Sequence, residues 1–229
     1  MADSARNNGN FFHVVGNSKQ QMRKHRRVLL GIVGLSVLLF LNAASTEEIA
    51  RLSRLMGWKA GQTLADVGAG AGEIGIAAAA VVGESGKVYL TELDTQKLSA
   101  LQETVQRKGL KNVLVVEAAE KKTNLPDNCC DEIVLRRVYH HFTAPREMDA
   151  SLLRSLKPQG EIAVIDFPPR KWLSESDPVK GVPANRGGHG IPQEILIEEM
   201  TSAGFTVDKV VDDWPEDSYC VVFRKPAGK

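Results

Sequence analysis

The sequence predicts an α/β domain with a mostly parallel sheet, and two observations support this class. From Thr46 onward, short apolar strand patterns alternate with helical patterns, as in chains that build a parallel sheet covered by helices. The last two strand patterns, Phe205–Val211 and Tyr219–Arg224, are separated by a few mostly polar residues, too few for a helical crossover. These two strands are therefore expected to pair as an antiparallel hairpin at the end of the sheet.

The remaining elements follow from apolar spacing and from helix start and stop residues. The first helix is expected to begin at Thr46 and to end at Gly57, and Asp94 is expected to cap the helix after the second strand. The segment from Pro168 to about Pro192 is rich in Pro and Gly and is predicted to be a long loop. The other expected strands are 63–67, 87–93, 113–117, 131–138 and 160–167, and the other expected helices are an Ala-rich stretch to 82, 95–108, 145–156 and 193–203.

The first 45 residues differ in character from the rest. Residues 1–27 carry six Lys and Arg against one acid, which leaves about −4 on the remainder of a chain whose net charge is +1. The basic cluster leads directly into the apolar run 28–41, which is typical of a signal peptide or of a short membrane anchor. We expect residues 1–45 to associate with a membrane through 28–45 or to be cleaved on export, and residues 46–229 to form the folded domain. The side of the membrane stays open, as does the oligomeric state.

Composition excludes several classes of protein. Hydrophobic residues make up 43% of the chain and charged residues 25%, as in globular proteins with a real core. The three cysteines show neither a disulfide framework nor metal-ligand spacing. The mildly acidic domain gives no electrostatic reason to bind nucleic acid, so no nucleic-acid partner is expected.

The candidate site begins at the glycine-rich turn 68–72, between the first strand and its helix. Glycines let the backbone turn tightly and let a ligand approach the main chain, and the helix N-terminus offers free N–H groups. The letters of Gly70, Gly72 and Gly75 also match the dinucleotide motif GxGxxG. An NAD-binding oxidoreductase or epimerase is therefore an alternative interpretation.

Two carboxylates favour a different cofactor. Asp66, two residues before the first glycine, would repel an anionic pyrophosphate but attract the ammonium and sulfonium groups of S-adenosylmethionine. Glu92, at the end of the second strand, can accept hydrogen bonds from both ribose hydroxyls. Together they favour S-adenosylmethionine over NAD.

From about Thr46 to its C-terminus, the chain resembles the class I S-adenosylmethionine-dependent methyltransferases of the type 11-like group. The match is carried by the stretch 66–72, by Glu92, by Ala118-Ala119-Glu120 and by Leu125-Pro126-Asp127 before Tyr139-His140-His141-Phe142. The resemblance implies a three-layer Rossmann-like fold with a seven-stranded sheet, and methyl transfer to a small-molecule O, N or S acceptor. The cofactor-binding residues that it predicts are Asp66, Gly68, Ala69, Gly70, Gly72, Glu92, Leu93, Ala119, Glu120 and Arg137.

Three histidines are candidates for a general base. His140 and His141 follow the fourth strand, and His189 lies in the Gly-rich loop. The favoured interpretation is that they shape the pocket, because methyl transfer from a sulfonium often needs only alignment of the two reactants. Their spacing, with Asp166, specifies no metal site, and none is predicted. A third function class, a membrane-tethered binding protein without catalysis, is opposed by the intact glycines and acids.

Overall fold

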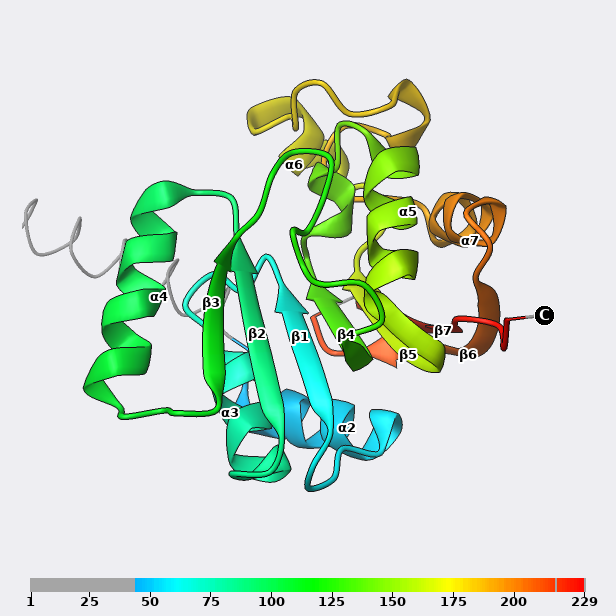
Figure 1. Cartoon of the computed structure of the whole chain (residues 1–229). Coiled ribbons are helices and arrows are strands. Elements are labelled where there is room, and N and C mark those ends of the chain that lie inside the picture. Colours follow the sequence, from blue (N-terminus) through cyan, green and yellow to red (C-terminus); the bar gives the residue numbers. More distant parts are fainter. Residues whose placement is uncertain (1–43, 217, 229) are drawn as a thin grey trace, which may run out of the picture. The chain divides into compact units, whose positions relative to one another are not determined.

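The structure is a computed structural model that describes residues 44–216 and 218–228 (Figure 1). The predicted membrane or signal segment at 28–41, and nearly all of the predicted N-terminal unit 1–45, lie outside these residues. Within the described part of the chain, no helix is both long and apolar enough to cross a bilayer.

A seven-stranded sheet in the order β3-β2-β1-β4-β5-β7-β6 organises the domain. Strands β3 to β5 in this order run parallel to one another, whereas β7 pairs antiparallel with both β5 and β6. The strands are β1 (Thr63–Val67), β2 (Lys87–Glu92), β3 (Val113–Glu117), β4 (Cys130–Arg136), β5 (Leu156–Asp166), β6 (Thr206–Trp214) and β7 (Ser218–Arg224). The predicted fold class and its terminal hairpin are therefore confirmed.

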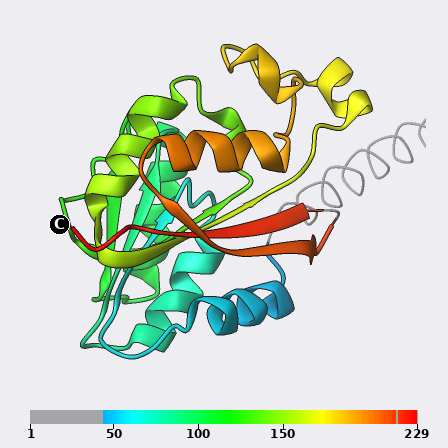
Figure 2. The same cartoon turned by 90° about the vertical axis from the view of Figure 1, so that its right-hand side faces the viewer.

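Helices cover both faces of the sheet and give the domain three layers, which the edge-on view in Figure 2 shows clearly. The longer helices are α2 (Thr46–Met56), α3 (Glu73–Val82), α4 (Thr95–Arg107), α5 (Pro145–Ser155) and α7 (Gln193–Ser202). Leu152 of α5 and Leu196 of α7 are buried in one apolar core, and Leu52 of α2 and Leu101 of α4 are buried in the other. Each such leucine contributes about 1.5–3 kcal/mol by leaving water.

Side-chain caps set the starts of two helices, and the cap by Asp94 was predicted from the sequence. The Ser45 hydroxyl accepts a hydrogen bond from Glu48 N at 3.0 Å and so caps α2. The Asp94 carboxylate accepts from Gln96 N at 2.8 Å and Lys97 N at 3.0 Å at the start of α4. Each cap satisfies N–H groups that the helix itself leaves without partners.

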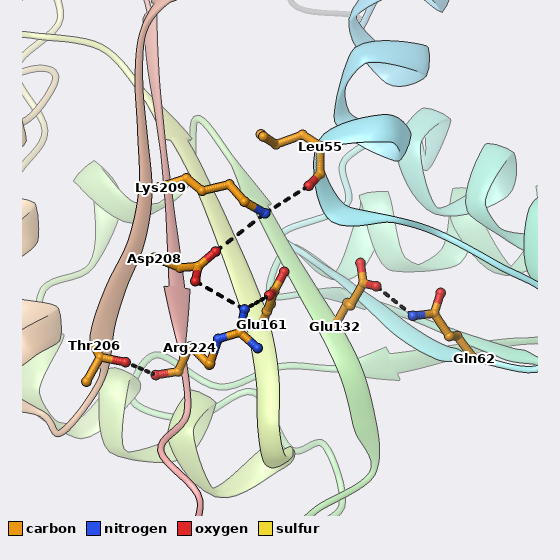
Figure 3. Close-up of polar contacts among 8 residues, drawn as sticks. All are labelled: Leu55, Gln62, Glu132, Glu161, Thr206, Asp208, Lys209 and Arg224. Carbon is orange, nitrogen blue, oxygen red and sulfur yellow. Dashed lines mark hydrogen bonds and ion pairs between the residues drawn. The ribbon is translucent and has the colours of Figure 1, made fainter.

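Polar side chains tie the hairpin to the sheet near the amino ends of β4 and β5 (Figure 3). The Arg224 guanidinium of β7 pairs with Asp208 at 3.1 Å and also with Glu161 of β5. The Gln62 amide before β1 donates to Glu132 of β4 at 2.7 Å. These contacts join strands that are far apart in the sequence.

Several boundaries differ from the predictions. Strand β5 begins at Leu156 rather than at 160, because a register shift between β4 and β5 lets the chain bulge where Gln159 has a φ of 64°. The hairpin is longer than expected, since Trp214 still pairs with Ser218 across the turn. The predicted loop 168–192 contains a short helix, α6 (Lys171–Ser176), and a 3₁₀ turn, η2 (Ala184–Arg186). A second 3₁₀ turn, η1 (Tyr139–His141), follows β4, which ends earlier than predicted.

Candidate functional site

The glycine turn lies at the carboxyl end of β1 and is bound to the neighbouring strand β2. Gly68 N and Ala69 N donate to the Thr91 carbonyl at 3.0 and 2.9 Å, so the turn is held by its backbone. Gly70 has a φ of 55°, and a Cβ built on it would meet no described residue within 4 Å. The turn therefore presents an open backbone face, which fits a cofactor approaching at this position.

Gly72 completes the turn as the residue that precedes α3. Its φ is 82°, and a Cβ there would lie 2.8 Å from Leu101 Cδ2. Only glycine therefore suits both the backbone and the packing at this residue. The Ala69 side chain is buried in the apolar core, and its carbonyl accepts from Gly72 N at 2.7 Å, so this residue supports the turn.

Asp66 lies in β1, with its carboxyl group against the first turn of α3. Its carboxyl group is buried, and Oδ2 accepts a hydrogen bond from Gly75 N, in the first turn of the helix, at 2.9 Å. Burial raises the pKa of this carboxyl group to about 7. Asp66 thus joins β1 to the first turn of α3 through a buried carboxyl group.

Glu92 connects the glycine turn to the end of β2. Oε2 accepts from Gly70 N at 3.1 Å, and Oε1 accepts from Leu93 N at 2.9 Å and Asp94 N at 3.1 Å. The carboxylate is buried, whereas the Leu93 side chain beside it is 52% exposed. An acid held next to an open glycine turn, with an exposed apolar side chain beside it, suits a nucleoside.

The stretch Ala118-Ala119-Glu120 lies beside Glu92, as its predicted role requires. Ala118 N donates to the Glu92 carbonyl at 2.9 Å. Ala119 forms an isolated bridge with Lys122, and Glu120 is exposed. The ends of β1, β2 and β3 thus bring together three of the predicted segments.

Arg137 lies at the end of β4 with a φ of 56°, which is rare for a residue other than glycine. Its backbone N–H donates to the Ile165 carbonyl at 2.7 Å. Its guanidinium pairs with Glu216 in the turn between β6 and β7. The sequence gives no sign of this pairing. It turns the side chain of Arg137, a residue predicted to bind the cofactor, toward the hairpin.

The three candidate bases are brought together by the structure. The ring centroids of His140 and His141 are 4.0 Å apart, and those of His140 and His189 are 5.1 Å apart. His140 Nδ1 lies 2.8 Å from Asp166 Oδ1, and both residues are buried. Desolvation and the two neighbouring rings lower the pKa of His141 to about 4, so this ring is neutral at neutral pH.

A buried polar network beneath these rings was missed by sequence reasoning. Arg186 is fully buried and donates to the Tyr139 carbonyl at 2.5 Å and to Glu199 at 2.6 Å. The Tyr139 hydroxyl lies 2.9 Å from Asp149 Oδ2 and 3.0 Å from Glu199 Oε2. An arginine beside glycines in a loop is expected to be exposed. No local signal therefore reveals that Arg186 joins the 168–192 segment to η1.

Comparisons with known proteins agree with this geometry. Residues 59–204 match the family model described as a methyltransferase domain, which is more than half of the chain. The chain belongs to this family, that of class I S-adenosylmethionine-dependent methyltransferase domains. The solved structure of an S-adenosylmethionine-dependent methyltransferase from Aquifex aeolicus is similar with a TM-score of 0.66 and 28% identity, covering 82% of this chain and 97% of that one.

Two further proteins are similar to this chain, one a curated relative and one a structure solved with the cofactor. The ubiquinone/menaquinone biosynthesis C-methyltransferase UbiE of Azotobacter vinelandii is 31% identical over 114 residues, which are 49% of this chain and 45% of that protein. The match thus spans less than half the length of this curated relative. Phosphoethanolamine N-methyltransferase 2 of Haemonchus contortus, solved with S-adenosyl-L-methionine, shares the fold with a TM-score of 0.62 at 16% identity, covering 79% of this chain and 52% of that one.

The family assignment decides between the cofactors weighed from the sequence. S-adenosylmethionine is the cofactor of the family, as predicted. The NAD-binding and non-catalytic alternatives gain no support from the family or from these relatives.

Proposed function

We propose that this protein transfers the methyl group of S-adenosylmethionine to the O, N or S atom of a small-molecule acceptor. The observation that carries the proposal is the open face of Gly70 beside the buried Glu92 carboxylate, in a chain of the methyltransferase family. S-adenosylmethionine supplies an electrophilic methyl group on a sulfonium. The protein supplies the surface that orients the two reactants and excludes water.

Glu92 is proposed to hold the ribose of the cofactor. A carboxylate offers about four acceptor positions, and three backbone N–H groups already point at this one. These donors fix the carboxylate in one orientation at the end of β2. Oε2 accepts only one of the three N–H groups, so it keeps a position for a hydroxyl group of the ribose.

Alignment rather than general base catalysis is proposed as the main source of rate. A base works best when its pKa is near the operating pH, and the pKa of His141 is lowered to about 4. Asp166 and the Asp177 carbonyl hold Nδ1 of His140 and Nδ1 of His189, so both rings are fixed in orientation. Their proposed role is therefore to form the acceptor side of the pocket.

The acceptor class is tested with methyl-labelled S-adenosylmethionine and the low-molecular-weight fraction of a cell extract. We expect label in a small organic product with the wild-type chain and none with Gly70→Val. Compounds of the quinone type, which accept a methyl group on carbon, should also be assayed, because the curated relatives are named as C-methyltransferases. Label that appears only in protein or nucleic acid would contradict the proposal.

We also propose that residues 28–45 associate the protein with a membrane. The proposal is supported by the apolar run, which directly follows a basic cluster. Fractionation of cells expressing the full chain and a form lacking residues 1–43 tests this. The full chain should sediment with membranes and the shorter form should not, whereas equal sedimentation would contradict the proposal.

A further inference from the structure

We propose that His140, His141 and His189 form a binding site for a divalent transition-metal ion of the zinc type. One ring nitrogen of each histidine lies within 4.8 Å of those of the other two. Neutral imidazole is a preferred ligand for this class of ion. The linear spacing of the residues gave no sign of such a site, because His189 reaches it from a segment some fifty residues away.

The distances require only a modest contraction of the cluster. Zinc binds imidazole nitrogen at about 2.0–2.1 Å, which places the nitrogens of a tetrahedral site about 3.3–3.4 Å apart. The separations of up to 4.8 Å therefore have to shorten by about 1.5 Å at most. Rotation of the exposed His141 ring can supply much of this change.

Two of the rings already have the outer partners that metal ligands need. His140 Nδ1 lies 2.8 Å from the Asp166 carboxylate, and His189 Nδ1 lies 2.5 Å from the Asp177 carbonyl. A histidine that binds a metal usually donates its other N–H to such an oxygen, which fixes the tautomer and the ring orientation. In both rings this arrangement leaves the Nε2 lone pair for a ligand.

The buried Nε2 atom of His140 is a second, independent indication. His140 is 2% exposed, and its Nε2 has no hydrogen-bond partner among the described residues. A buried polar atom without a partner costs about 1–3 kcal/mol. A metal ion bound at Nε2 would supply the missing partner.

The backbone around the three rings is fixed before any ion binds. Arg186 donates to the carbonyl of Tyr139, so it holds the segment of His189 against the turn that carries His140. The backbone N–H of His189 also donates to the Ser174 hydroxyl at 3.1 Å. Such fixed support reduces the entropy that metal binding must overcome.

Three protein ligands leave a fourth coordination position for water or for a substrate atom. Val138, two residues before His140, packs against the glycine turn, because its side chain would sit 2.6 Å from a Cβ on Gly68. An acceptor oxygen or sulfur could therefore fill the fourth position, a consequence that rests on the proposed function. Metal binding itself does not depend on methyl transfer.

The test measures binding of Zn²⁺ alone to the full chain without a polyhistidine tag, after treatment with a chelator. His13 and His25 are the only other histidines, so the variant carrying His13→Ala and His25→Ala serves as the background. We expect one Zn²⁺ per chain in this background. Co²⁺ should give the visible absorption of a four- or five-coordinate site with nitrogen ligands.

Single variants then assign the ligands. His141→Ala and His189→Ala should each weaken Zn²⁺ binding by more than about 100-fold, since loss of an outer partner alone costs about 10–100-fold. Asp166→Asn should fall within that smaller range. Melting temperatures show whether each variant is folded. Because His141 is exposed, its substitution should disturb folding least of the three histidines. Absent binding, an affinity unchanged by both His→Ala variants, or a thiolate-to-cobalt charge-transfer band would overturn the proposal.

Discussion

The two ends of the sheet use polar side chains differently. Near the amino ends of β4 and β5, Arg224 pairs with Asp208 and Glu161, and Gln62 pairs with Glu132 (Figure 3). At the carboxyl ends, Glu92 accepts from three backbone N–H groups around the open turn, and Nε2 of buried His140 has no hydrogen-bond partner in the part of the chain that the structure describes.

The difference indicates which end of the sheet can carry a ligand-binding site. Contacts at the amino ends connect strands and helices, so their loss should lower stability. At the carboxyl ends, helices begin and loops are free to vary, which is where α/β sheets bind ligands. Matched substitutions at the two ends therefore separate effects on binding from effects on stability.

The largest effect is expected from Gly70→Val compared with Gly57→Val. Both glycines have positive φ (55° and 70°), and no atom of the described residues lies within 4 Å of an added Cβ, so each variant stores about 1–3 kcal/mol of strain. Only Gly70→Val places its side chain in the proposed cofactor site. Its affinity for S-adenosylhomocysteine, measured by equilibrium dialysis, should fall more than about 100-fold.

Gly57→Val is the control for this loss. It should bind as the wild type does while losing comparable thermal stability. Equal binding by Gly70→Val and the wild type would mean that the cofactor does not approach this turn.

Glu92→Ala should show the next largest effect on binding. Loss of hydrogen bonds to a charged group costs about 1.5–3 kcal/mol, which corresponds to about 10–150-fold weaker binding of S-adenosylhomocysteine by calorimetry. Glu161→Gln, at the other end of the sheet, should leave this affinity unchanged. A larger loss of affinity for Glu161→Gln than for Glu92→Ala would contradict cofactor binding at the end of the sheet that carries Glu92.

Asp66→Ala should act mainly on stability. It leaves Gly75 N buried without its partner, at a cost of about 1–3 kcal/mol in the free energy of unfolding. Asp66→Asn keeps an acceptor oxygen and should recover most of that loss in denaturant titrations. If both variants unfold like the wild type but fail to bind the cofactor, the carboxyl group contacts the ligand directly.

The smallest effect on cofactor binding is expected from Glu132→Gln, near the amino end of β4. Burial raises the pKa of Glu132 from 4.5 to about 7, so the folded state is penalised as pH rises through this interval, while the unfolded chain ionises freely. Wild-type stability should therefore fall by about 2–3 kcal/mol more than that of Glu132→Gln between pH 4.5 and 7. Parallel pH profiles of the two proteins would show that Glu132 does not titrate in this range.

Local patterns predicted much of the fold and part of the site. Alternating elements and the short link before β7 gave the sheet and its hairpin, and Glu92 was found because its position after the second strand is fixed by the fold. Arg186 and the grouping of His189 with His140 could not be predicted, since they depend on how residues 168–192 fold back over η1. The enclosed position of Asp66 likewise depends on packing against α3.

Hydrogen–deuterium exchange with and without saturating S-adenosylhomocysteine tests the location of the cofactor most directly. We predict slower exchange in peptides covering residues 68–72, 92–94 and 118–120, and unchanged exchange near Gly57 and Glu161. Protection near Gly57 or Glu161, with none in the glycine turn, would contradict the assignment of the site to the carboxyl ends of the strands.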